Sequence, residues 1–95
     1  MNDDSHDAWE QDFVEAGAEL EHARWARWQA YVFSRCVRNP DGSVTINRED
    51  VARWQRQITT LYGQLSESEK ESDRKESRSY LPLVRAAVTR AKQKC

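Results

Sequence analysis

The side chains that most often carry acid–base or metal chemistry are few in this sequence, and their spacing suits neither. His6 and His22 are the only histidines, and neither stands beside a nucleophile or at a zinc-ligand spacing from a cysteine. Carboxylates are numerous, but the sequence forces no Asp or Glu into an apolar pocket, which an acid–base pair needs to separate its two pKa values. Glycine-rich phosphate loops and nucleophile elbows are absent. We therefore expect a non-enzymatic protein without catalytic residues, cofactor or metal.

Length and composition indicate one helical domain. The 95 residues include only three Gly and two Pro, so few turns interrupt the chain. We expect a single domain over residues 1–95, with residues 1–6 frayed. No apolar run is long enough to span a membrane, and no secretory signal peptide is recognisable. We therefore expect a cytoplasmic protein with free thiols, in which Cys36 is a core residue and Cys95 is exposed.

Charge is unevenly distributed, although the net charge is only −1. Residues 1–21 carry no Lys or Arg but eight acidic side chains: Asp3, Asp4, Asp7, Glu10, Asp12, Glu15, Glu19 and Glu21. Residues 80–95 carry no acid but four basic side chains: Arg85, Arg90, Lys92 and Lys94. Either the two ends pair within the fold, or the acidic end meets a basic partner. The near-neutral total argues against a direct nucleic-acid binder, which needs a clustered positive surface.

A tract without any apolar side chain covers residues 66–79. It is either a solvated helix or a disordered joint. Ser66 and Glu69 have the spacing of a capping box, which favours a helix that starts there. Apolar residues return at Tyr80, and Pro82 predicts a kink or the start of a new helix.

The N-terminal third of the chain predicts a long helix from about Asp7 to Val37. Apolar residues recur at spacings of three and four between Trp9 and Ala23, which draws one stripe along a helix. A second apolar stripe follows the first along the chain and is displaced around the helix. The helix is therefore either continuous or broken around residues 17–23.

A turn and a second helix follow. Pro40-Asp41-Gly42 fits a tight turn, residues 43–46 have the composition of a short extended segment, and Asn47 can cap the next helix. The predicted fold class is all-α: a small bundle of three principal helices, with a short extended segment near residues 43–46. We expect its core to contain Trp25, Trp54, Leu61, Leu65, Leu81 and Val84. Arg24, Trp28, Tyr31 and Arg35 cannot all point inward on one helix, so we expect some of them to be exposed or to meet a partner.

The sequence from Leu61 to Val84 resembles the signature of the RyR-type domain. The residues that match this motif are Tyr62, Leu65, Glu69, Lys70, Asp73 and Arg74. The string His22-Ala23-Arg24-Trp25 resembles the upstream His-x-x-Trp helix of the same family. The glycine-tryptophan segment and the His-Pro turn usual between these parts are replaced here by Asn39–Ile46.

The resemblance implies a domain that binds nucleotide-derived ligands or acts as an interaction module. In the first case Lys70 and Arg74 contact phosphate, and Trp25 or Tyr62 stacks a base. Small proteins with this tail are typical of phages and prophages. In size, helicity and acidic end the chain is similar to anti-CRISPR and other anti-defence proteins.

Our first hypothesis is a non-enzymatic, phage-type interaction protein. It inhibits a bacterial defence complex of the CRISPR-Cas type in the host cytoplasm by occupying a basic nucleic-acid-binding surface, and it contacts neither nucleic acid nor membrane itself. Its predicted partner-binding residues are Asp12, Glu15, Glu19, Trp28, Tyr31, Glu69 and Asp73. The alternative is an RyR-like domain for a nucleotide-derived molecule. A third hypothesis is a homodimer that buries the stripe from Trp9 to Leu20.

Overall fold

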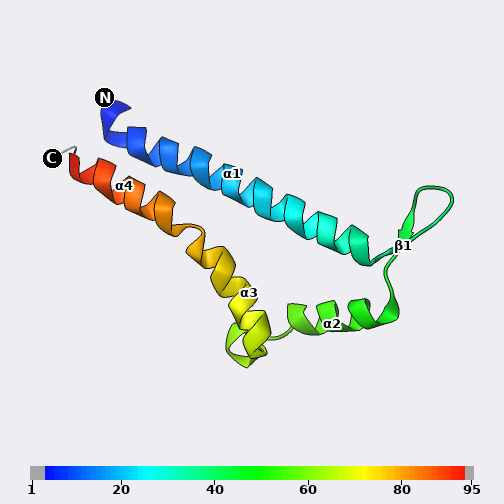
Figure 1. Ribbon diagram of the computed structural model, residues 1–95. Coiled ribbons are helices and arrows are strands. Elements are labelled where there is room, and N and C mark those ends of the chain that lie inside the picture. Colours follow the sequence, from blue (N-terminus) through cyan, green and yellow to red (C-terminus); the bar gives the residue numbers. More distant parts are fainter. Residues whose placement is uncertain (1–3, 94–95) are drawn as a thin grey trace. The chain divides into compact units, whose positions relative to one another are not determined.

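The computed structural model describes residues 4–93, which form four α-helices and one short hairpin (Figure 1). In chain order the elements are α1 (Asp4–Arg35), β1 (Val37–Arg38), β2 (Val44–Thr45), α2 (Arg48–Ile58), the 3-10 turn η1 (Tyr62–Gln64), α3 (Glu67–Arg78) and α4 (Leu81–Gln93). The predicted all-α class with a short extended segment is confirmed.

The first helix is continuous from Asp4 to Arg35, so the break considered for residues 17–23 does not occur. Gly17 lowers the stability of the helix by about 1 kcal/mol relative to Ala. The long helical segments on both sides of Gly17 compensate for this loss. Of the segment predicted to fray, residues 1–3 lie outside the described residues and residues 4–6 are helical. The helix ends before Val37 because Val37 pairs with Thr45 in the hairpin.

The hairpin between α1 and α2 is closed by the predicted turn. The Asn39 N–H donates to the Ser43 carbonyl at 2.8 Å, and the Gly42 N–H donates to the Asn39 carbonyl at 3.1 Å. Gly42 has φ of 91°, a left-handed conformation that glycine adopts at little cost. Strands β1 and β2 are antiparallel, so α2 starts close to the end of α1.

Side-chain caps start α2 and α3. The Asn47 Oδ1 accepts from the Asp50 N–H at 2.8 Å. The Ser66 Oγ accepts from the Glu69 N–H at 3.2 Å, and Glu69 Oε1 accepts in return from the Ser66 N–H at 3.0 Å. The capping box is therefore confirmed, and most of the polar tract is helix α3. Pro82 lies in the first turn of a new helix, α4, as one of the two predictions had it.

The described chain divides into two compact units by its contacts, and the single domain expected from its length stays a prediction. Unit 1 contains Met1–Arg24 and Asp73–Cys95, and unit 2 contains Trp25–Ser72.

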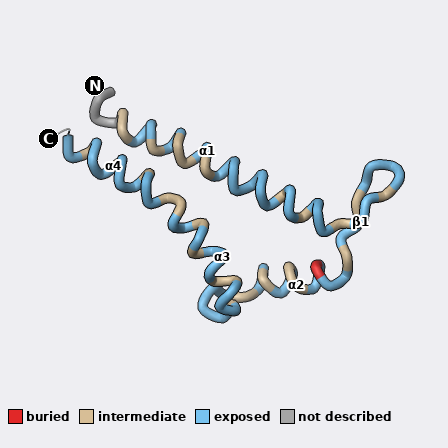
Figure 2. The backbone as a smooth tube through the Cα atoms, in the orientation of Figure 1, coloured by how far each residue is buried: buried red, intermediate tan, exposed pale blue. Residues whose placement is uncertain are grey.

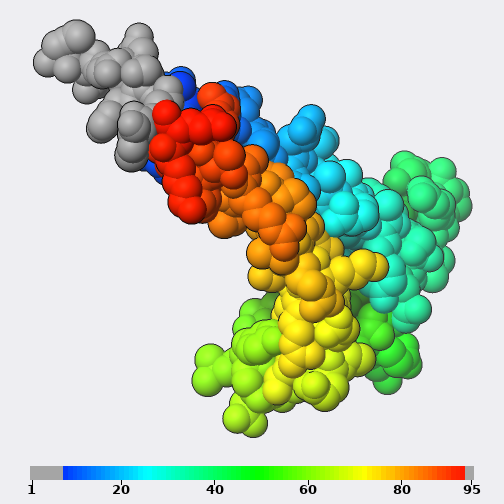
Figure 3. Space-filling model, turned by 60° about the vertical axis from the view of Figure 1, so that its left-hand side comes forward, coloured from blue at the N-terminus to red at the C-terminus, as the bar shows by residue number. Residues whose placement is uncertain are grey.

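In unit 1, α4 lies along the N-terminal part of α1 (Figures 1 and 3). The Arg90 guanidinium donates to Asp12, and the Tyr80 hydroxyl donates to Glu21. Tyr80, directly before α4, meets the later of these two α1 residues, and Arg90 near the end of α4 meets the earlier one, so the two helices run antiparallel.

Apolar burial is weak throughout the described residues. No apolar side chain there is buried, and Asp50 in α2 is the one buried residue (Figure 2). The predicted core is therefore wrong. Four of its members are exposed and two are half-buried, the exposed ones being Trp25, Leu61, Leu81 and Val84 and the half-buried ones Trp54 and Leu65. For Leu81 and Val84 the physical reason is visible in unit 1, where two helices lying side by side cover only one face of each other.

The Asn47 cap is expected to contribute about 1 kcal/mol to the free energy of unfolding. Replacing Asn47 with Ala removes the acceptor for the Asp50 N–H, whereas Asn47→Ser keeps a side-chain acceptor. We expect urea unfolding followed by circular dichroism to give the Ala variant the lower stability. Equal stabilities of the Ala and Ser variants would show that the cap contributes nothing.

Candidate interaction surfaces

A buried carboxylate joins α1 to α2 within unit 2. Asp50 is 1 % exposed. It accepts hydrogen bonds from Arg35 Nε at 2.7 Å and Arg35 Nη2 at 2.8 Å. Asn47 Nδ2 donates to it at 2.9 Å, and Arg53 Nη2 pairs with it at 2.9 Å. We call these four residues the Asp50 cluster. Because a bidentate guanidinium–carboxylate pair fixes both distance and orientation, the cluster sets the position of α2 against the end of α1.

The pKa of Asp50 reflects these contacts. The hydrogen bond from Arg35 lowers the pKa of the Asp50 carboxyl most, and Asn47 and Arg53 lower it further against the opposing effect of desolvation. The same hydrogen bond raises the pKa of Arg35. Asp50 is thus buried among polar partners and not in an apolar pocket, and its burial was not predicted from the sequence. The sequence missed Asp50 because its place in the first turn of α2 reads as an ordinary helix-start acid, and nothing local links it to Arg35.

Three aromatic rings pack beside the Asp50 cluster. The ring centroids of Trp28 and Tyr31 are 5.5 Å apart, and those of Trp28 and Trp54 are 5.6 Å apart in an edge-to-face arrangement. Arg53 donates to the Tyr31 hydroxyl at 3.2 Å, and its guanidinium carbon lies 5.8 Å from the Trp54 ring centroid. Trp28 and Tyr31 remain 46 % and 42 % exposed. This agrees with the prediction that some of Arg24, Trp28, Tyr31 and Arg35 are exposed. This aromatic cluster therefore stabilises unit 2 and also presents apolar area to solvent.

An acidic face runs along α1 in unit 1. Asp12, Glu15 and Glu19 follow one another at spacings of three and four, which places them on one side of the helix. All three are exposed. Asp12 pairs with Arg90, whereas Glu15 and Glu19 form no ion pair with any described residue. The Asp12–Arg90 pair supports, at one point, the interpretation that the two ends of the chain pair within the fold. Binding of the acidic end to a basic partner stays a prediction.

The stripe from Trp9 to Leu20 lies on a different side of α1. Trp9, Phe13, Ala16 and Leu20 are half-buried. The last three lie between Asp12 and Glu21, which Arg90 and Tyr80 contact. The stripe that the homodimer hypothesis assigned to a second copy is thus partly covered within unit 1.

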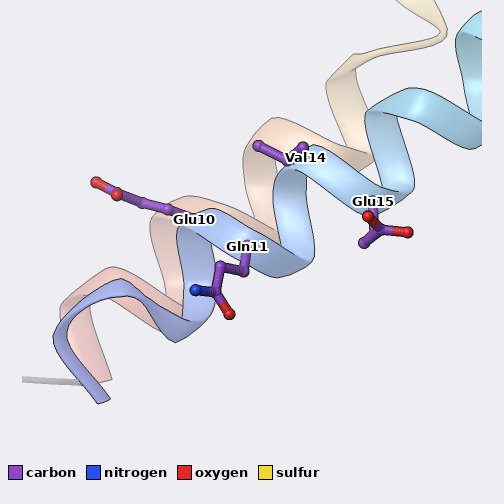
Figure 4. Close-up of a pocket in the computed structure, with 4 residues that line it drawn as sticks. All are labelled: Glu10, Gln11, Val14 and Glu15. Atoms are coloured by element: carbon purple, nitrogen blue, oxygen red, sulfur yellow. The ribbon is translucent and has the colours of Figure 1, made fainter. Parts of the chain in front are cut away.

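A shallow depression on α1 is lined by Glu10, Gln11, Val14 and Glu15 (Figure 4). All four residues belong to one helix, and the carboxylates of Glu10 and Glu15 point away from each other. Polar groups of a small-molecule site converge on one point, so this depression lacks that geometry.

The residues considered first for chemistry are scattered. His22 is exposed on α1, and Cys36 is a half-buried free thiol whose Sγ donates to the Val32 carbonyl at 3.1 Å. The side chains of His6 and Cys95 lie outside the described part of the chain. Between residues 4 and 93 no three potential metal ligands come together. No helix there combines the length and the apolarity that crossing a membrane requires.

The predicted partner residues of α3 have different surroundings. Glu69 accepts from Arg56 Nη2 and from Gln57 Nε2, each at 2.6 Å, and so joins α3 to α2 within unit 2. The bonds from Arg56 and then Gln57 lower the pKa of Glu69 to about 2. Asp73 is exposed and forms no ion pair with the described residues.

The predicted ligand residues come together only in part. Lys70 Nζ lies 5.9 Å from the ring centroid of Tyr62. Arg74 follows one turn later on α3 and is half-buried. Trp25 is 59 % exposed on α1.

The depressed pKa of Glu69 predicts a loss of stability in acid. Because the folded pKa is about 2 and the ordinary value is 4.5, the unfolded state binds more protons between these values, so stability is full above them and falls as the pH decreases. Urea unfolding between about pH 6 and pH 2 should show this fall. Glu69→Gln, and separately Arg56→Met, should make it shallower. An unchanged slope in both variants would contradict the assignment.

The chain was also compared with known proteins. No family model matches the sequence, and neither a curated protein nor a solved structure matches it significantly. The resemblance to the RyR-type domain stays a prediction from its motif.

Proposed function

We propose that this chain is a non-enzymatic interaction protein whose acidic face on α1 binds a basic surface of a partner protein. Most concretely, the partner is a bacterial defence complex of the CRISPR-Cas type, and the surface is the one with which that complex binds nucleic acid. The chain then acts as a phage-type inhibitor.

The observation that carries this proposal is the unpaired charge of Glu15 and Glu19. Both carboxylates are exposed on one side of α1, one turn apart, and no described Lys or Arg neutralises them. On a helix with 1.5 Å rise per residue they lie about 6 Å apart along the axis. Two adjacent anions on a rigid helix compete with phosphate groups for the same Lys and Arg side chains.

A second contact region is available in unit 2. Exposed Trp and Tyr side chains that are held in place by neighbours are frequent anchors of protein interfaces. Trp28 and Tyr31 meet this description, because Trp54 and Arg53 fix their positions. Their contribution is apolar, so it adds affinity that salt does not screen.

The test is competition with nucleic acid. Purified defence complexes, bound to fluorescently labelled target DNA or RNA, are titrated with the protein, and displacement is followed by anisotropy. We expect displacement that weakens with salt, and a loss of about tenfold in apparent affinity for the Glu15→Lys/Glu19→Lys variant. Glu49→Lys, a single Glu-to-Lys change at an exposed position of α2, is the control for Glu15→Lys and Glu19→Lys made one at a time. Equal affinity of wild type, double variant and control would contradict the proposal.

A nucleotide-derived ligand is the second candidate, favoured by the contact between Lys70 and Tyr62. A cation beside an aromatic ring can hold a phosphate next to a stacked base, and Arg74 adds a second cation on the same helix. Titration calorimetry with cyclic nucleotides and ADP-ribose-type compounds should give heat that Arg74→Ala abolishes and Lys75→Ala preserves. Absence of heat with wild type excludes this candidate.

A further inference from the structure

Helix α4 carries two apolar stripes, and α1 covers only one of them. Leu83, Ala87 and Ala91 are half-buried and share a face with Tyr80, whose hydroxyl reaches Glu21 of α1. This face therefore points towards α1. The apolar arc of α4 is wider than a single neighbouring helix can cover.

The second stripe consists of Leu81, Val84 and Val88. These side chains are 43 %, 43 % and 47 % exposed. At 100° per residue the stripe lies roughly 90° around α4 from the face towards α1. Two contact faces about a right angle apart are what each helix of a four-helix bundle has, because it touches two neighbours. Unit 1 supplies α4 with only one of these neighbours.

Charge indicates what the missing neighbour is. Arg85 and Lys92 flank the second stripe, are exposed and form no ion pair with the described residues. On α1, Glu10 is likewise exposed and unpaired within the described part. Val14, one turn after Glu10, is 62 % exposed. This chain therefore carries both halves of a complementary contact: an apolar stripe with basic flanks, and an apolar residue beside an acid.

We propose that the stripe of Leu81, Val84 and Val88 binds α1 of a second copy of this chain, so that two α1–α4 pairs form an antiparallel four-helix bundle. Within one copy Asp12 lies beside Arg90. The same antiparallel register between copies brings Val14 against Val88 and Glu10 near Lys92. In a twofold dimer each contact occurs twice, which doubles its effect on association.

The dimer is independent of the proposed function. Glu15 and Glu19 lie roughly 100° or more around α1 from Val14, so the acidic face stays accessible in the dimer. Each dimer then presents two acidic faces.

Sedimentation equilibrium of the full chain tests the proposal. We expect wild type to have twice the 11.1 kDa mass of the chain. Val88→Lys should raise the dissociation constant of the dimer about tenfold or more. Thr89→Lys adds the same charge at the next exposed position, on another side of α4, and should leave the dimer intact. Circular dichroism of both variants establishes that helix content is preserved.

Exchanging the charges of Glu10 and Lys92 tests whether a second copy of this chain covers the apolar stripe of α4. Lys92→Glu should weaken the dimer, and adding Glu10→Lys to it should restore the wild-type dissociation constant. A monomeric wild type, or equal effects of Val88→Lys and Thr89→Lys, overturns the proposal. A foreign protein that binds wild type, but not Val88→Lys, while wild type stays monomeric would assign the stripe to that protein instead.

Discussion

The paired guanidinium and carboxylate of Arg35 and Asp50 are the contact on which the α1–α2 arrangement of unit 2 depends. Asp50 is the one buried side chain among the described residues; its oxygens accept from Arg35 and Asn47 and form an ion pair with Arg53. A buried charge is tolerated only when it is paired and hydrogen-bonded, and removing one partner leaves the other uncompensated. The geometry of the Asp50 cluster is therefore narrowly constrained. Because Arg53 also contacts Tyr31 and Trp54, this constraint helps to position the aromatic cluster.

In this protein directional polar contacts do much to fix the positions of the helices relative to their neighbours within each unit. In larger domains an apolar core fixes these positions. Arg56 and Gln57 join α2 to α3 through Glu69, while Arg90 and Tyr80 join α4 to α1. Hydrogen bonds and ion pairs add little net free energy at an exposed surface, but they select one arrangement among many of similar burial. The apolar side chains left in contact with solvent are then available for other chains.

The charged residues divide into two groups with different consequences. Asp12, Glu69 and Asp50 are used inside the chain, so their substitution affects stability before it affects binding. Glu15 and Glu19 form no ion pair with the described residues, and neither do Glu10 and Lys92 on the helices of unit 1. The proposed contacts with other chains rest on these unpaired charges and on the uncovered apolar stripe of α4.

Local sequence signals determined the helices, the Pro40–Gly42 turn and the caps at Asn47 and Ser66, because each depends on residues only a few positions apart. Helical spacing also predicted that some of Arg24, Trp28, Tyr31 and Arg35 are exposed, but not which of them. Local spacing could not predict three other features: the burial of Asp50, the pairing of Asp12 with Arg90, and the exposure of Leu61 and Val84. These depend on which helices lie side by side, and a stripe of apolar residues is the same in the sequence whether a neighbour covers it or not. Only the tertiary structure decides that, because burial belongs to pairs of elements and not to one element.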